Sequence, residues 1–273
     1  MSTVTIVIGE TLEAAMLIAS LVVVGNAWFR RSTWLFPSLI AGALSAAIMG
    51  YFAATISDLW DGRGQEMTNA GTLILASVLL IVHHVLVSKR RAELFPGKIR
   101  ERTSSMIQLS TATVLVVLSV QREGAETIAL GLGFFGTDGF PPFLTGGTIG
   151  LIIGAVIGML LYYSLSALAR FGNTWLAETL LVFIAAGMMS HAIGYLAQAG
   201  MVDTGLPLWD SSFMIAENTV GGKFVTAVLG YEATPSMIQV AFHFTTLLVF
   251  LLFTICSKLV FPLKRSTQTM DTG

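Results

Sequence analysis

Long apolar stretches alternate with short polar connections along the whole chain. Seven of these stretches reach the roughly 20 residues that a helix needs to cross about 30 Å of hydrocarbon. The pattern therefore predicts an all-α fold, a polytopic membrane protein with seven transmembrane helices. We place these spans at residues 4–27, 35–57, 68–88, 106–135, 145–168, 174–198 and 236–261.

Basic residues concentrate at alternate connections between these spans. Lys and Arg favour the cytoplasmic side of a membrane. Arg63 and Lys223 are the basic residues on the opposite side, which is otherwise acidic. This split predicts an external N-terminus and a cytoplasmic C-terminus. The cytoplasmic group consists of Arg30, Arg31, Lys89, Arg90, Arg91, Lys98, Arg100, Arg102, Arg170, Lys258, Lys264 and Arg265.

The composition agrees with a membrane protein and limits the chemistry. Of the 273 residues, 54% are hydrophobic and 11% are charged, whereas a soluble domain carries about 25% charged residues. No basic patch indicates a nucleic-acid partner. The single cysteine, Cys256, excludes a disulfide within the chain and any cysteine-based metal cluster. We expect an integral protein of a bacterial or archaeal cytoplasmic membrane, with the lipid bilayer as a partner.

The fourth span contains three charges in five residues, Arg122-Glu123-Gly124-Ala125-Glu126. Each charge at the centre of a membrane helix costs roughly 2.5 to 3.5 kcal/mol on insertion scales, so such residues mark a functional site by default. Glu123 and Glu126 are three residues apart and share one helix face. Two carboxylates in this arrangement can bind one cation together.

The first span carries a weaker copy of the pattern, Gly9-Glu10-Thr11-Leu12-Glu13. Three spans separate the start of each unit, and an odd number reverses direction across the membrane. The chain is therefore predicted to form one permease domain, 1–273, of two inverted three-span repeats and an added helix. Such repeats place substrate sites at their interface. The repeats are residues 4–88 and 106–198, and the last helix is 236–261.

The four carboxylates admit two interpretations. In one, Arg122 neutralises one glutamate and hydrogen bonds hold the others protonated, because burial and like charges raise carboxylate pKa values. In the other, the excess of Glu10, Glu13, Glu123 and Glu126 over one arginine is satisfied by a metal ion. A rise of 1.5 Å per residue puts both pairs in the outer half of the membrane, where they can meet.

Histidines and one further glutamate are weaker candidates for metal ligation. His191 and His243 fall in the outer halves of the sixth and seventh spans, although a lone histidine on an apolar helix is more often a packing residue. Glu66 opens the third span, where acidic residues also favour a helix N-terminus. His83 and His84 are adjacent and point about 100° apart on a helix, which suits solvation at the interface or an exit path.

The long connection from Gln198 to Pro235 contains a half-apolar segment, Phe213 to Leu229. This segment fits a short interfacial or re-entrant helix and fits a plain outer loop equally well. In the fifth span, glycine recurs every fourth residue from Gly146 to Gly158, and Gly42 lies in the second span. Small residues at this spacing indicate close contact between helices.

At its two glutamate motifs, the chain resembles the oxidase-dependent iron permeases, which include the fungal high-affinity permeases and bacterial EfeU-like permeases. Their hallmark is Arg-Glu-Gly-Leu-Glu in the first and fourth spans. The chain departs from it at Gly9, which lacks the arginine, and at Asn69, where the family often has a glutamate. Further similarities are Leu160-Leu161-Tyr162, Ala185-Ala186-Gly187, Ala199-Gly200, Trp209-Asp210-Ser211 and the run from Gly230 to Ser236.

This resemblance implies a transporter, not an enzyme, that imports iron as its substrate and holds no cofactor. The matching metal ligands are Glu10, Glu13, Glu123 and Glu126, with Arg122 orienting one carboxylate. An extracytoplasmic oxidase or an iron-delivery protein is an expected partner. The alternatives are a permease for lead, manganese or zinc, and a membrane oxidoreductase subunit that holds a redox iron. The second would usually need Glu-x-x-His pairs, which no predicted span contains.

Overall fold

Helices form the regular structure of the residues described by the computed structural model, 3–26, 33–91, 98–171 and 174–260. The predicted all-α class is therefore confirmed for this part of the chain. Arg30, Arg31, Lys264 and Arg265, used to predict orientation, and the span ends at 27 and 261, lie outside the described residues. The helices are α1 (Thr3–Asn26), α2 (Leu35–Tyr51), α3 (Ala53–Ser57), α4 (Leu59–Gly62), α5 (Gly64–Arg91), α6 (Lys98–Phe134), α7 (Phe140–Arg170), α8 (Trp175–Gln198), α9 (Val220–Leu229) and α10 (Met237–Val260).

Five helices, α1, α5, α7, α8 and α10, are long and apolar enough to cross a membrane. They support an integral membrane protein. The other two predicted spans coincide with α2, which has 17 residues, and with α6, which has 37 residues and contains the charged motif. The count of seven spans and the orientation remain predictions.

The second predicted span ends earlier than its hydrophobicity indicates. Helix α2 stops at Tyr51, and the short helices α3 and α4 follow it. Trp60, Asp61 and Gly62 then adopt positive φ angles of 49°, 60° and 84°. This left-handed turn reverses the chain into α5. The predicted span, 35–57, ends before this turn, but it does not record the break between α2 and α3 at Phe52.

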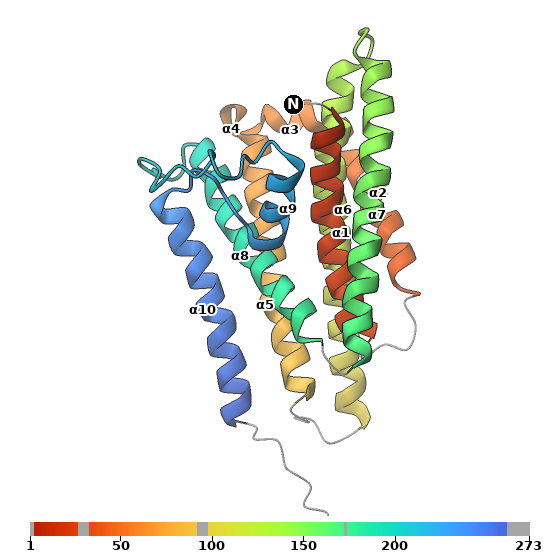
Figure 1. Ribbon diagram of the computed structural model, residues 1–273, viewed down its shortest axis with the longest axis vertical. Coiled ribbons are helices and arrows are strands. Elements are labelled where there is room, and N and C mark those ends of the chain that lie inside the picture. Colours follow the sequence, from red (N-terminus) through yellow and green to blue (C-terminus); the bar gives the residue numbers. More distant parts are fainter. Residues whose placement is uncertain (1–2, 27–32, 92–97, 172–173, 261–273) are drawn as a thin grey trace, which may run out of the picture.

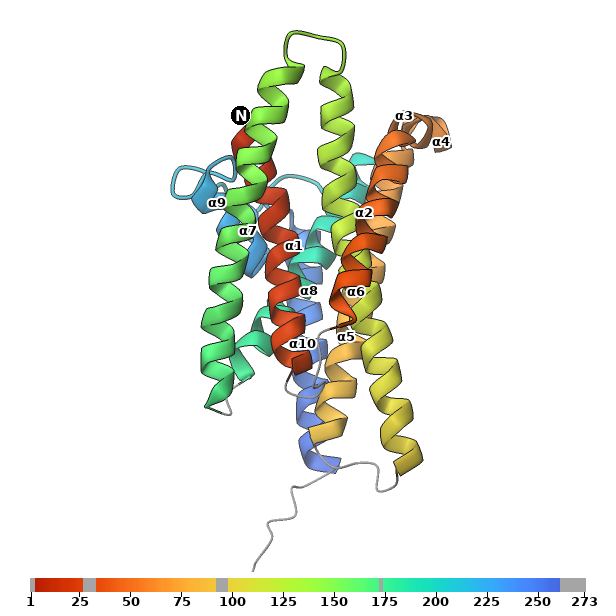
Figure 2. The same ribbon diagram turned by 90° about the vertical axis from the view of Figure 1, so that its right-hand side faces the viewer.

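The long helices pack in pairs that join distant parts of the chain. In Figure 2, α1 runs beside α7, and α2 runs beside α6. Helices α5 and α8 form a third pair, and α10 packs on α8 (Figure 1). The two helices that carry the glutamate motifs, α1 and α6, also contact one another. Each motif helix thus has one extensive partner from the other predicted repeat.

Small residues allow both of these close pairings. The glycine stripe of α7 lies against α1: a Cβ atom at Gly154 would stand 2.6 Å from Cβ of Thr11. Helix α2 presents a matching stripe to α6, and a Cβ atom at Gly42 would stand 2.7 Å from Cβ of Val120. The predicted close helix contacts are confirmed. The buried small residues are Gly146, Gly150, Gly154 and Gly158 on α7, and Ser38, Gly42, Ala46 and Gly50 on α2.

The connection between α8 and α10 contains a helix, α9, which packs against α1 and α8. Thr219 caps its start, because its Oγ1 atom accepts a hydrogen bond from the Gly222 amide at 3.0 Å. Gly230 ends it with a φ of 65°. Of the two sequence interpretations of this segment, the short helix is the one the structure adopts. It lies beside the N-terminal half of α1 (Figure 1).

Candidate metal-binding site

The glutamates of the two motifs meet where α1 contacts α6. Glu10, Glu123 and Glu126 each offer a carboxylate oxygen, and these three oxygens lie within 4.8 Å of one another. Glu10 and Glu123 are buried. Because like charges repel strongly in a low-dielectric interior, such a group needs a cation or protons between its members. The three oxygens are close enough to coordinate a single metal ion.

The fourth glutamate, Glu13, is held to one side by Arg122. Nη1 of Arg122 lies 3.3 Å from Oε2 of Glu13 and also pairs with Oε1 of Glu123. Nε of the same guanidinium is 3.7 Å from Oε1 of Glu126. Arg122 is only 8% exposed, so it is a buried cation shared by three of the four carboxylates. It limits their repulsion and fixes their positions.

One carboxylate oxygen of the site lacks a protein partner. Oε2 of Glu123 is buried and makes no hydrogen bond to any of the described residues. Buried polar atoms are nearly always satisfied by protein, water or a bound ion. The free oxygen therefore marks the position at which Glu123 is available as a ligand, while its other oxygen is engaged by Arg122.

Asn69 of α5 completes the surroundings of Glu126. Its Nδ2 atom donates a hydrogen bond to Oε1 of Glu126 at 3.2 Å. Asn69 is a position at which the chain departs from the family that it resembles, and its side chain lies against Glu126 of the second motif. It therefore helps to orient a carboxylate that Arg122 also approaches.

A polar cavity of about 230 Å³ leads to the carboxylates from the end of the molecule that carries α9. Its walls come from α1, α6, α8 and α9, from the segments that flank α9, and from the start of α10. We call this cavity the outer vestibule, after the orientation predicted from the distribution of charged residues. It is lined by Glu10, Glu13, Arg122, Glu126, His191, Gly194, Tyr195, Gln198, Glu217, Lys223, Thr226, Tyr231, Glu232 and Gln239.

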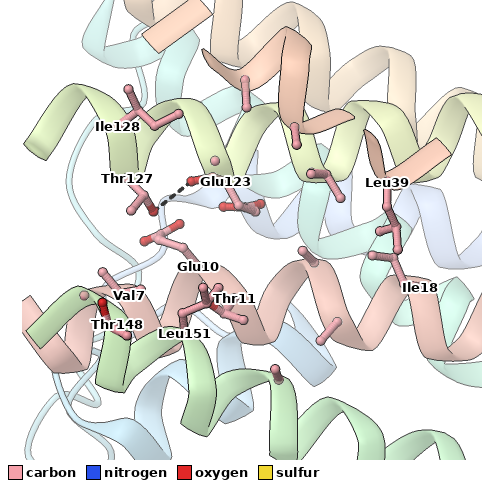
Figure 3. A pocket seen from close by; sticks show the side chains of 18 of the residues that line it. Val7, Glu10, Thr11, Ile18, Leu39, Glu123, Thr127, Ile128, Thr148 and Leu151 are labelled. Carbon is pink, nitrogen blue, oxygen red and sulfur yellow. Dashed lines mark hydrogen bonds between the residues drawn. The ribbon is translucent and has the colours of Figure 1, made fainter. Parts of the chain in front are cut away.

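A second cavity, of about 550 Å³, lies between the α1/α7 and α2/α6 pairs. Figure 3 shows Glu10 and Glu123 facing one another across it, with Leu151 and Leu39 on its walls. The lining is mostly apolar. The nearby Thr127 hydroxyl donates to the backbone oxygen of Glu123 at 3.0 Å, so it serves the helix. The carboxylates thus lie between one polar and one apolar cavity.

The weaker candidates from the sequence separate in the structure. His191 lines the outer vestibule with the glutamates. His243 instead approaches Gly230 and has its ring 5.8 Å from that of Phe244. Glu66 lies in the first turn of α5 and does not line the outer vestibule.

The adjacent histidines bind different helices, as their predicted divergence requires. Nδ1 of His83 is 3.0 Å from the Thr111 hydroxyl of α6, and Nε2 of His84 is 2.9 Å from the Thr254 hydroxyl of α10.

Sequence reasoning did not assign the vestibule residues of α9 and the following segment to the site. The available signal was Lys223, an isolated cation on an acidic side of the chain.

Comparisons with known proteins identify similar sequences. The sequence model of the iron permease FTR1 family matches residues 55–267. The chain is 26% identical to the ferrous iron permease EfeU of Escherichia coli O6:H1 over 254 residues, which cover 89% of this chain and 91% of that protein. It is 25% identical to the ferrous iron permease EfeU of Yersinia pestis over 250 residues, or 88% and 87% of the two chains. No solved structure matches.

Proposed function

The chain belongs to the iron permease FTR1 family, and from this premise we propose that it imports iron through the site formed by Glu10, Glu13, Glu123 and Glu126. The resemblance inferred from the two motifs is thereby confirmed at the level of the family. The site is our proposal, because the matched residues 55–267 include the second motif and begin after the first.

The observation that carries the proposal is the approach of three carboxylates from α1 and α6 to within 4.8 Å. Ionisable residues inside membrane-spanning helices mark ion pathways. Oxygen ligands suit hard cations, and an imidazole such as that of His191 in the vestibule favours transition metals such as iron. Glu10, Glu123 and Glu126 bind the ion directly, while Arg122 holds Glu13 and screens the others.

The helix pairings support the inverted-repeat architecture. The proposed repeats are α1, α2 and α5, and then α6, α7 and α8. If each helix is replaced by its counterpart in the other repeat (α1 by α6, α2 by α7 and α5 by α8), the α1/α7 pair becomes the α6/α2 pair. Both of these pairs have extensive contacts. The replacement leaves the α5/α8 and α1/α6 pairs unchanged, and both are in contact. We infer seven spans with α10 added, the N-terminus outside and the C-terminus in the cytoplasm.

This architecture gives transport a direction. The outer vestibule opens beside α9, on the side that the charge distribution assigns to the exterior. Iron enters there, binds between the repeats and leaves towards the cytoplasm when the repeats rearrange. An iron-delivery protein outside the membrane would supply the ion. No resident cofactor is part of this scheme.

Iron uptake by the purified protein in liposomes tests the proposal. Glu123→Gln and Glu126→Gln remove ligand charge and keep side-chain size, so each should lower the uptake rate at least about tenfold. Glu178→Gln is the matched control, because Glu178 lies in the first turn of α8 with Thr174 as its partner. Iron uptake that is undiminished in both motif variants would refute the site. Competition by lead, manganese and zinc ions then defines selectivity.

A further inference from the structure

Lys223 of α9 reaches across α1 to the first glutamate motif. Its Nζ atom lies 3.9 Å from Oε1 of Glu10, and its side chain is 22% exposed. The aliphatic stem passes directly over Gly9: a Cβ atom added there would be 2.8 Å from Cδ and 3.1 Å from Cε of Lys223. The glycine therefore provides the space in which the lysine side chain lies.

The two copies of the motif differ at this position. In α6 the residue before the first glutamate is Arg122, whose guanidinium contacts the neighbouring carboxylates. In α1 the equivalent residue is Gly9, which has no side chain. We propose that Lys223 supplies, from a helix more than 200 residues away in sequence, the positive charge that the first motif lacks. It is thereby a specificity-determining residue of the metal site.

The net charge of the site shows how Lys223 would affect the choice of metal ion. The inference rests on the proposed function, in which the four glutamates bind the transported ion. When ionised, these carboxylates together with Arg122 and Lys223 carry a formal charge of −2. One divalent cation neutralises that charge, whereas loss of Lys223 would leave −3. Because uncompensated charge is costly inside a protein, Lys223 sets the site for divalent over trivalent ions.

Lys223 also occupies the right place to act on an entering ion. It lines the outer vestibule together with Glu10, Glu13 and Glu126. The other acidic residues of the vestibule are engaged elsewhere: Glu217 accepts a hydrogen bond from the Ala233 amide, and Glu232 accepts one from Nε2 of Gln239 at 2.6 Å. They line the approach to the site, whereas Lys223 faces Glu10 of the first motif.

A competition assay in liposomes tests the role of Lys223. Mn²⁺ serves as the transported divalent probe and Tb³⁺ as a trivalent inhibitor. The measured quantity is the ratio of the Mn²⁺ KM to the Tb³⁺ inhibition constant. Lys223→Met should raise this ratio about tenfold, because the repulsion that is lost scales with the charge of the ion and is partly screened by water. Lys223→Arg should keep the wild-type ratio.

Moving the charge back to α1 provides the decisive variant. The double variant Gly9→Arg/Lys223→Ala places a cation at the position equivalent to Arg122, in space that removal of the lysine frees. It should return the ratio towards the wild-type value. Arg63→Gln, which removes an exposed cation of the same face, is the control and should leave the ratio unchanged.

The outcomes separate the two proposals. If the wild-type protein transports Mn²⁺ and Lys223→Met leaves the ratio unchanged, the role of Lys223 is overturned while the permease function stands. If neither iron nor Mn²⁺ enters liposomes with the wild-type protein, the proposed function fails and this inference fails with it. Monodisperse elution of each variant at the wild-type volume establishes that the ratios come from folded protein.

Discussion

Nη1 of Arg122 lies 3.3 Å from Oε2 of Glu13, which joins α6 to α1 by a partly buried ion pair. The same guanidinium pairs with Glu123 and approaches Glu126. A single side chain therefore holds the two motif helices at the separation that brings three carboxylates together. The stability of the bundle and the geometry of the site depend on the same contact.

Removal of this guanidinium should destabilise the protein strongly. Arg122→Leu leaves the buried carboxylate of Glu123 without its cation, and breaking a buried ion pair costs about 3 to 5 kcal/mol. We expect a clear decrease in Tm in detergent, and a smaller decrease for Arg122→Lys. Arg170→Leu, at the exposed end of α7, is the control. Equal Tm values for Arg122→Leu and the control would contradict the role assigned to Arg122.

Alanine substitutions at the glycines of α7 should destabilise the protein most where the least space surrounds the glycine. At Gly154 a Cβ atom would stand 2.6 Å from Cβ of Thr11, next to Glu10 in the sequence. Gly154→Ala should therefore push α7 from α1, cost about 1 to 3 kcal/mol and reduce iron uptake. At Gly147 the nearest atom would be 4.0 Å away, on Val7. Gly147→Ala is expected to keep the wild-type Tm and uptake, and a reversed order would show that the stripe does not set the packing.

Asn69 should contribute to metal affinity through Glu126. Asn69→Ala removes the 3.2 Å hydrogen bond to Oε1 of Glu126. Hydrogen bonds to charged groups contribute about 1.5 to 3 kcal/mol, so Mn²⁺ affinity measured by titration should fall about tenfold. Thr72→Ala on the same helix removes a hydroxyl that donates to the backbone oxygen of Thr68, one turn earlier in that helix. The two variants should differ, and similar affinities would argue against the orienting role.

Glu232 should make stability depend on pH. Burial raises the pKa of Glu232, repulsion by Glu217 adds to this, and the hydrogen bond from Gln239 partly offsets it. A carboxyl whose folded-state pKa is raised stabilises the fold while it is protonated, and this contribution is lost as pH rises through the folded-state pKa. Glu232→Gln should therefore raise Tm relative to wild type at about pH 7 and lose that advantage near pH 4. A constant Tm difference across this range would contradict the assignment.

The sequence alone points to the residues of the proposed site that lie on long apolar helices. Glu10, Glu13, Glu123 and Glu126 stand out because charge is rare there, and their spacing and depth require no tertiary information. The depth estimate places both pairs in the same half of the membrane, and α1 and α6 bring three of these glutamates together. The separate position of Glu13 depends on how the Arg122 side chain turns, which spacing cannot reveal.

The parts that were missed come from tertiary packing. Lys223 lies in a segment that fits a loop as well as a helix, and its contact with Glu10 follows from the docking of α9 on α1. His191 and His243 have the same status in the sequence, yet only His191 lines the outer vestibule. The hydrophobic pattern does not record which face of α8 or α10 meets the other helices.

The motif helix of each half packs on a helix of the other half, and this packing affects when the protein can fold during its synthesis. Helix α1 is synthesised early with Glu10 and Glu13, and its glycine-bearing partner, α7, follows more than 100 residues later. Until α7 leaves the ribosome, the first acidic helix lacks its main neighbour in the lipid. Because α1 packs on α7 and α2 packs on α6, the final tertiary structure, and with it the proposed metal site, is assembled only after most of the polypeptide has been translated.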